Sequence, residues 1–358
     1  MIYNDIYFAK NDYSYSVTAP TSSIYKKALI LYKNNAINLN APLLAGALPN
    51  GMATFNLKDI LAQSDIFTEV SLYDLPNTQT SLPFMQIIKV QTADLGSNVT
   101  FTGDEIKFVP AHLPAILQEQ FGVNYLSITA QEKRWFSLAP AVKVTDLSAK
   151  EYLYYLNYSS SNITNITVHF RVFKGLSFAD HTITATSKMD ELLVINTSWQ
   201  RIKEVYNLDD SVTHYEVYLS ANSEVLTQLY TYYVDHYPAS WTSYLYFKNQ
   251  FGLWDTIRFV ERTKQTQDSE TSTFESSTHT FDYLSVITHK LAFKTDSLAD
   301  GWLKYYADEL LGSSEIYLKQ DNSYIRLSKV SSSIDTFDPA KTSDILEIEF
   351  KLARTDTR

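Results

Sequence analysis

Apolar and polar residues alternate in short runs along most of this chain, and this two-residue period constrains its fold more than any other feature. In "TNITVHFRVFK" the side chains of Ile166, Val168 and Phe170 would share one face of a strand, while those of Thr167 and His169 would share the other. The chain also has 26 Tyr and 19 Phe but only 9 Gly, which favours pleated, half-buried surfaces. The sequence therefore predicts a mainly β protein.

The runs of strands and the breaks between them divide the chain into four segments. Residues 1–93 are predicted to form an N-terminal β-sandwich, and the proline-containing residues 94–149 an irregular connector with short strands and a helical turn. About five strands at short spacing predict a second antiparallel sandwich, of the immunoglobulin or fibronectin type, over residues 150–237. Residues 238–358 are predicted to form a C-terminal β-sheet domain with one helix.

That helix is predicted over about residues 298–311, in "DSLADGWLKYYADELLG". Ser297 and Asp300 resemble a capping box at its start, and Gly312 stands where a left-handed C-cap belongs. Apolar residues recur with the helical period, so one side of the helix should pack against the sheet. The residues expected to make this contact are Trp302, Leu303, Tyr306 and Leu310.

The densest aromatic stretch is "YLYFKNQFGLWDTIRF", residues 244–259, and it predicts a hairpin with a loop over residues 249–253. Asn249 and Gly252 are expected to form the turn because they tolerate positive φ, and Asp255 to accept backbone N–H bonds that close the loop. The aromatic side chains would anchor the hairpin either to the neighbouring sandwich or to another subunit. The hairpin and assembly candidates are Trp241, Tyr244, Tyr246, Asn249, Gly252, Trp254 and Asp255.

Several function classes are disfavoured by what the sequence lacks. The net charge is −10 and no basic block occurs, so we expect no nucleic-acid partner. No run of about 18 apolar residues and no secretory leader are present, so we expect neither a membrane span nor export by the general secretory route. There is no cysteine, no HExxH or GxSxG motif and no glycine-rich phosphate loop. We therefore predict a non-enzymatic protein with no catalytic, cofactor-binding or metal-binding residues.

Two alternatives stay open. Paired acids can be brought together by a fold without any local motif, so Glu204, Asp235, Asp255 and Glu261 are candidates for a glycan hydrolase. Exposed aromatic rings can stack on sugars, which would make the chain a carbohydrate-binding or host-receptor-binding module. The rings considered for that role are Tyr232, Tyr233, Tyr237, Trp241, Tyr244 and Tyr246.

The order of several segments resembles virion structural proteins, tail-associated, of phages and prophages of Bacteroidetes-type hosts. The similar pieces are "GMATFNLKDIL", "RWFSLAP" followed by "KEYLYYLNY", "YLYFKNQFGLWDTIRF" and "YADELLGSSEIYLKQDNSYIRL". The resemblance implies a structural component of the tail, tail hub or baseplate, made in the host bacterial cytoplasm and then built into the virion. Its implied partners are further copies of itself and other virion proteins, with a host surface glycan as a further candidate. It implies no catalytic residues.

Overall fold

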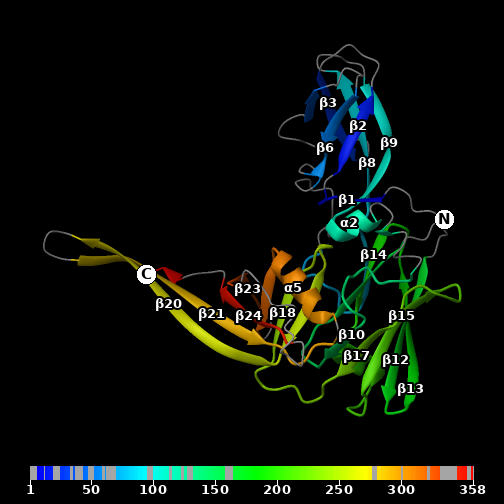
Figure 1. Cartoon of the computed structure of the whole chain (residues 1–358). Coiled ribbons are helices and arrows are strands. Elements are labelled where there is room, and N and C mark those ends of the chain that lie inside the picture. The colour runs from blue at the N-terminus through cyan, green and yellow to red at the C-terminus, as the bar shows by residue number, and fades with distance from the viewer. Residues whose placement is uncertain are drawn as a thin grey trace.

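The computed structural model describes residues 6–11, 13–18, 25–32, 35–36, 43–46, 52–58, 61, 70–94, 100–112, 115–121, 125–126, 132–157, 164–275, 280–299, 301–320, 323–330, 345–352 and 356–357. The fold is mainly β, with several largely antiparallel sheets and three short helices in this part of the chain, which confirms the predicted fold class. One sheet stands apart from the rest at the N-terminal end of the molecule, and a long hairpin projects from the C-terminal part (Figure 1).

The N-terminal sheet has the strand order β1-β9-β8-β3-β4, with β5 also paired to β3. Its strands are β1 (Ile6–Phe8), β9 (Thr100–Val109), β8 (Gln86–Asp94), β3 (Tyr25–Tyr32), β4 (Asn35–Ala36) and β5 (Leu43–Gly46). A second pair, β2 (Ser14–Thr18) and β6 (Met52–Asn56), shares a core with this sheet through Phe55, Ile88 and Phe108. The predicted boundary at residue 93 falls inside the sheet, because β9 of the predicted connector pairs with β8.

Two sheets form a sandwich in the middle of the chain. The larger has the order β10-β17-β15-β12-β13, with β16 also paired to β15, and the smaller has the order β11-β14-β7. The larger sheet consists of β10 (Val142–Thr145), β17 (Tyr230–Val234), β15 (His214–Ala221), β12 (Asn165–Lys174), β13 (Ser177–Thr186) and β16 (Glu224–Val225). The smaller sheet consists of β11 (Tyr152–Leu156), β14 (Glu191–Asn196) and β7 (Gln79–Pro83).

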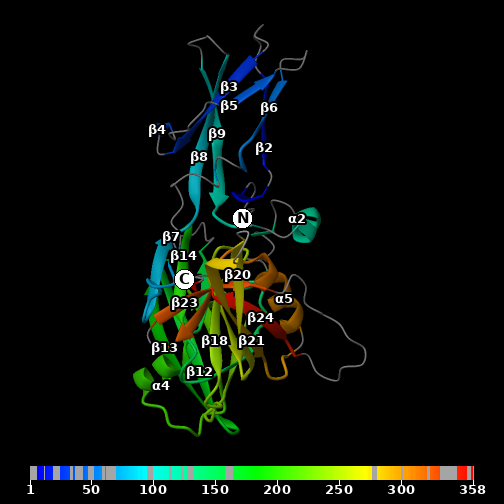
Figure 2. The same ribbon diagram turned by 90° about the vertical axis from the view of Figure 1, so that its left-hand side faces the viewer.

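The predicted alternation in β12 is confirmed, since Ile166, Val168 and Phe170 are buried in the core that also holds Leu153 and Ile195 of the smaller sheet. Two features depart from the sequence-based expectation. Strand β7 lies within the predicted first domain but pairs with β14 of the second, and β10 pairs with β17 in parallel. The helix α4 (Trp199–Tyr206) was not predicted, and the short helix α2 (Ala115–Phe121) lies to one side of the lower end of the N-terminal sheet (Figure 2).

The C-terminal sheet has the order β19-β18-β22-β23-β24-β21-β20, with β25 also paired to β21. Its strands are β18 (Ser243–Lys248), β19 (Trp254–Phe259), β20 (Glu261–Glu275), β21 (Thr280–Lys294), β22 (Ile316–Gln320), β23 (Ser323–Lys329), β24 (Glu347–Leu352) and β25 (Asp356–Thr357). Only Val260 separates β19 from β20, so one continuous stretch of chain joins the first and last strands of this order. The sheet therefore curls back toward itself.

The helix α5 (Trp302–Gly312) covers one face of this sheet. The four predicted packing residues, Trp302, Leu303, Tyr306 and Leu310, are all buried. The predicted caps are wrong. Gly301, with φ of +83°, is the N-cap and no side chain caps the helix start, while Gly312 is the last helical residue and Ser313 is the extended C-cap. A glycine takes the N-cap because the chain enters the helix through a left-handed conformation.

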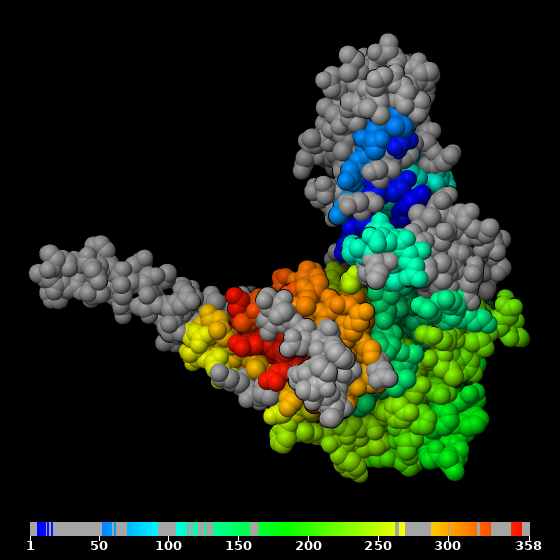
Figure 3. Space-filling model, in the orientation of Figure 1, coloured from blue at the N-terminus to red at the C-terminus, as the bar shows by residue number. Residues whose placement is uncertain are grey.

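The small middle sheet is buried on both faces, because the C-terminal sheet packs against the face that the larger middle sheet leaves free. Tyr154 and Val194 share a core with Tyr246 and Trp254 of the hairpin β18–β19. On the other side of β18, Leu245 and Phe247 pack toward α5. In the space-filling view the orange C-terminal residues abut the green residues of the middle sandwich (Figure 3). The middle and C-terminal parts thus form one packed body.

Candidate functional site

The aromatic stretch forms the predicted hairpin, with β18 and β19 paired from Ser243↔Phe259 to Lys248↔Trp254. Asn249 closes the loop with its side chain, whose Oδ1 accepts the N–H groups of Phe251 at 3.1 Å and Leu253 at 3.0 Å. Gly252 has φ of +74°, as predicted for a turn former. The role of Asn249 differs from the prediction, because it works as a hydrogen-bond acceptor and its φ is not positive.

Asp255 does not close the loop, which corrects the predicted role. Its carboxylate accepts a hydrogen bond from the Tyr305 hydroxyl at 2.6 Å and lies 3.4 Å from Nζ of Lys143. The single backbone N–H that the structure gives it is that of Thr256, at 2.7 Å. Asp255 is the second residue of β19, and its side chain faces Tyr305 on α5 instead of the loop.

The hairpin aromatics meet sheets of their own chain. Tyr244, Tyr246 and Trp254 are between 1% and 6% exposed, and Nε1 of Trp254 donates to the carbonyl of Val70 at 2.7 Å. Tyr246 accepts the N–H of Lys150 on its hydroxyl at 3.0 Å. The sequence left open whether these rings pack against a neighbouring sandwich or against another subunit. In the structure they pack inside their own chain. Trp241 differs from them because it is 60% exposed.

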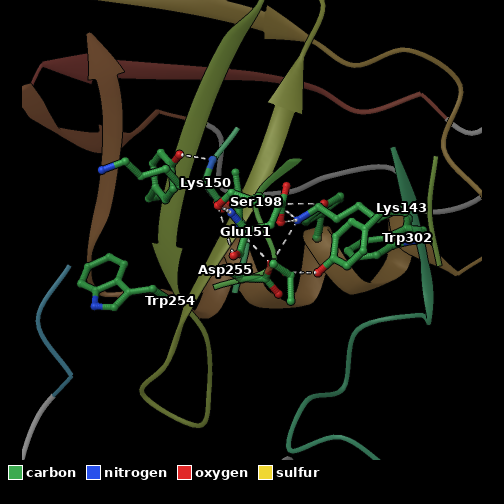
Figure 4. A network of polar contacts seen from close by, with 12 residues as sticks. Lys143, Lys150, Glu151, Ser198, Trp254, Asp255 and Trp302 are labelled. Carbon is green, nitrogen blue, oxygen red and sulfur yellow. Dashed lines mark hydrogen bonds and ion pairs between the residues drawn. The ribbon is translucent and has the colours of Figure 1, made fainter. Parts of the chain in front are cut away.

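Beside the hairpin lies a buried ionic cluster that the sequence did not reveal (Figure 4). Nζ of Lys143 is 2.7 Å from Oε2 of Glu151, 2.6 Å from the carbonyl oxygen of Thr256 and 3.4 Å from Asp255. The Lys143 and Glu151 side chains are 6% and 3% exposed. The elements that bring these groups together are β10, the segment before β11, and β19.

Burial raises the pKa of Glu151 to about 7, although the adjacent Lys143 acts to lower it. Burial acts to lower the pKa of Lys143, but the neighbouring carboxylates of Glu151 and Asp255 outweigh that effect and raise it. The ammonium group is therefore held in its charged form by two carboxylates. Because all of its contacts are made inside the protein, this arrangement fits a structural ion pair rather than a reacting group.

A second ionic cluster surrounds Arg258 on β19. Its guanidinium contacts Asp146 at 3.1 Å and Asp296 at 3.3 Å, and it also pairs with Asp235. Asp146 additionally accepts a hydrogen bond from the Tyr244 hydroxyl. One buried cation thus holds three aspartates that come from distant parts of the sequence.

The four acids considered for a hydrolase have different partners. Asp235 pairs with Arg258, and Asp255 with Lys143 and Tyr305. Glu204 accepts a hydrogen bond from Gln200 on the exposed side of α4, and Glu261 is an exposed residue at the start of β20. No facing pair of free carboxylates is formed by these four residues.

A pocket of about 340 Å³ opens between the edge strand β10 and the segment that leads into α5. Arg258 and Lys143 contribute cationic side chains to its lining, and Trp302 and Tyr233 contribute aromatic rings. Within the described residues, no group of three or more His, Cys, Asp or Glu side chains is arranged to hold a metal ion. No helix in this part of the chain is long and apolar enough to cross a membrane. The residues lining the pocket are Val142, Lys143, Val144, Tyr233, Arg258, Asp296, Ser297, Leu298, Ala299, Trp302 and Tyr306.

Comparison with known proteins gives no family. No protein-family model and no curated protein matches the chain. Among solved structures, the chain is similar to the full extracellular region of plexin A4, domains 1 to 8, with a TM-score of 0.21 and 6% identity over 97% of this chain and 35% of that one. A structure of domains 1 to 10 of the same region gives a TM-score of 0.21 and 6% identity, with 97% and 30% covered. The chain thus spans about a third of those proteins, and at this TM-score the likeness carries no functional information.

Proposed function

We propose that this protein is a non-enzymatic structural subunit of a larger particle that assembles with further copies of itself. The observation that carries the proposal is the arm formed by β20 and β21, two paired strands of 15 residues each, which projects from the body (Figure 1). The particle that the sequence resemblance implies is a phage virion, in its tail, tail hub or baseplate region. The protein would be made in the bacterial cytoplasm and built into the virion together with other virion proteins.

The arm has an edge that is suited to pairing with another chain. In the part of the chain that the structure describes, β24 pairs with β21 over Lys290–Lys294, and β25 pairs with it at Val286 and Ile287. Among the described residues, no strand pairs with the other edge of β20, so a row of backbone N–H and C=O groups is available there. Because an isolated two-stranded ribbon is only marginally stable in water, contact with another subunit would stabilise the arm.

The body is suited to hold such an arm in a fixed direction. The base of the arm continues directly from β19, which is buried between the middle sandwich and α5. The ionic clusters around Lys143 and Arg258 tie β19 to β10 and to the segment around Asp146. A rigid hub with a projecting arm is an arrangement that favours ring or fibre formation.

Shortening the arm tests the proposal. Since Gln265 pairs with Leu291, residues 266–290 can be replaced by Asn-Gly, which forms a two-residue hairpin turn. We expect mass photometry to show oligomers of the full chain and monomers of the shortened chain, with a cooperative unfolding transition in both showing that the body stays folded. Trp241→Ala, which changes an exposed ring outside the arm, is the control and should still form oligomers.

A full chain that stays monomeric at high concentration and is absent from purified particles would overturn the proposal. Oligomers that survive the shortening would show that assembly uses another surface. Identification of this protein in virions by mass spectrometry, with the shortened form excluded from them, would support the phage setting directly.

Binding of a surface glycan is a second candidate function, favoured by rings that the body leaves exposed. Tyr237 is 90% exposed, Trp241 60% and Tyr233 49%, whereas Tyr232, Tyr244 and Tyr246 are buried. Exposed Trp and Tyr rings are suited to stacking on sugars. Glycan-array binding that disappears with Trp241→Ala and persists with the far-side variant Phe178→Ala would support this function. Binding that is equal in both variants, or missing in the native chain, would count against it.

A further inference from the structure

The pocket beside β10 contains an unpaired strand edge. The N–H of Thr231 donates to the carbonyl of Ala141, and that of Asp235 to the carbonyl of Thr145, each at 2.8 Å. These odd-numbered residues of β10 and its flank therefore point their backbone groups toward β17, and the even-numbered residues point theirs the other way. The indole of Trp302 confirms the outward direction, since it donates to the carbonyl of Val142.

Val144 is the next outward residue along this edge. Its N–H and C=O groups face away from β17 and, within the described part of the chain, have no hydrogen-bond partner. The residue lines the pocket and is 38% exposed. A donor and an acceptor on one residue at a free strand edge are the groups that an added strand uses.

The charges around the pocket favour a cationic ligand group. Two buried cations, Lys143 and Arg258, pair with five carboxylates, so carboxylates outnumber cations here even with Glu151 partly protonated, and of the five Asp296 is the one in the pocket lining. Asp296 lines the pocket and its side chain is 40% exposed, whereas both cations are less than a tenth exposed. The carboxylates counted are Asp146, Glu151, Asp235, Asp255 and Asp296.

We propose that this pocket binds a short extended peptide segment that carries a Lys or Arg side chain. The central residue of the segment would pair with Val144 through its own N–H and C=O, and its basic side chain, or that of a neighbour, would meet Asp296. Trp302 limits the segment at one end, because its indole already occupies the carbonyl of Val142. The volume of about 340 Å³ lies at the small end of ligand pockets, which suits two or three residues.

The test uses the full chain labelled with ¹⁵N-valine and three peptides. The probe is acetyl-Thr-Lys-Thr-amide; the comparisons are acetyl-Thr-Glu-Thr-amide and the probe methylated on the lysine backbone nitrogen. We expect the probe to shift the amide signals of Val142 and Val144, and the other two peptides to leave them unchanged. Equal shifts from all three peptides, or none from the probe at millimolar concentration, would overturn the proposal.

Variants locate the contact. Val144→Pro removes the outward N–H at an edge position where proline is tolerated and should abolish binding. Asp296→Asn should weaken binding by about tenfold, the effect of losing one charged contact. Asp180→Asn, on the exposed strand β13, is the matched control and should bind as the native chain does. Unchanged affinity in both Val144→Pro and Asp296→Asn would also refute the site. These results are independent of oligomer formation through the arm.

Discussion

Glu309 on α5 shows how a single buried carboxylate supports the hairpin loop. It is 2% exposed and accepts the N–H of Gln250 at 2.7 Å and the side-chain Nε2 of the same residue at 3.1 Å. Burial raises the pKa of this carboxyl from 4.5 to about 7, although the hydrogen bonds from Gln250 act against that shift. The charged form is therefore less favourable in the folded state than in the unfolded chain.

This raised pKa predicts a loss of stability as the pH increases. The folded state binds the Glu309 proton more tightly than the unfolded chain does. The stabilisation that results is fully present below pH 4.5 and is lost as the pH rises through about 7. Glu309→Gln should therefore raise the free energy of unfolding by up to ~3 kcal/mol at pH 8 and change it little at pH 4.5. Urea unfolding at both pH values checks this. Asp308→Asn, an exposed neighbour, is the control, and an equal gain in both variants would contradict the assignment.

The Lys143 cluster leads to a second prediction about a single residue. Lys143→Met leaves Glu151 and Asp255 buried without their cation, and we expect a loss of ~3–5 kcal/mol in the free energy of unfolding. Adding Glu151→Gln to this variant should recover part of the loss, because one uncompensated charge is then removed. Denaturant titrations of the single and double variants measure both effects. A double variant less stable than Lys143→Met would show that Glu151 has another role.

Among the elements, the β18–β19 hairpin depends on one side chain for its loop. Asn249→Ala removes the acceptor of two backbone N–H groups and should lower the free energy of unfolding by ~1–3 kcal/mol. Asn249→Asp keeps an acceptor oxygen in the same place and should retain most of the stability. Thermal unfolding of the two variants distinguishes them. Equal losses would mean that the amide NH₂ group, rather than the oxygen, matters.

The elements that the sequence predicted are those with a strong local period. Strand β12 and α5 were predictable because their apolar residues repeat every 2 or 3.6 positions, and the hairpin because a loop with Asn249 and Gly252 separates two apolar runs. In β10 the pattern is inverted, since Val142 and Val144 are partly exposed while Lys143 is buried. That inversion depends on Asp255, 112 positions away in the sequence, and on Glu151. No local pattern carries such a contact, so the ionic clusters could not be predicted.

At the scale of the whole molecule, the domain boundaries are the feature that the sequence describes least well. The predicted second sandwich, residues 150–237, lacks two strands that its sheets use, β7 and β10. Its small sheet is also covered by the C-terminal sheet through Tyr246 and Trp254. Strand pairing across long sequence separations leaves no local signal, whereas turn residues do, and the predicted boundaries followed the turns.

This arrangement predicts that residues 150–237 will not fold as an isolated fragment. The fragment would expose the apolar face of β11 and β14 that the C-terminal sheet covers, including Tyr154 and Val194, and would leave the β17 edge without β10. We expect it to bind a hydrophobic dye and to unfold without a cooperative transition, whereas the full chain should show a cooperative transition for this region. Calorimetry and hydrogen exchange on the fragment and on the full chain check this. A cooperative transition in the isolated fragment would instead mean that the middle sandwich is stable without its cover, and that its packing against the C-terminal sheet joins two independent domains.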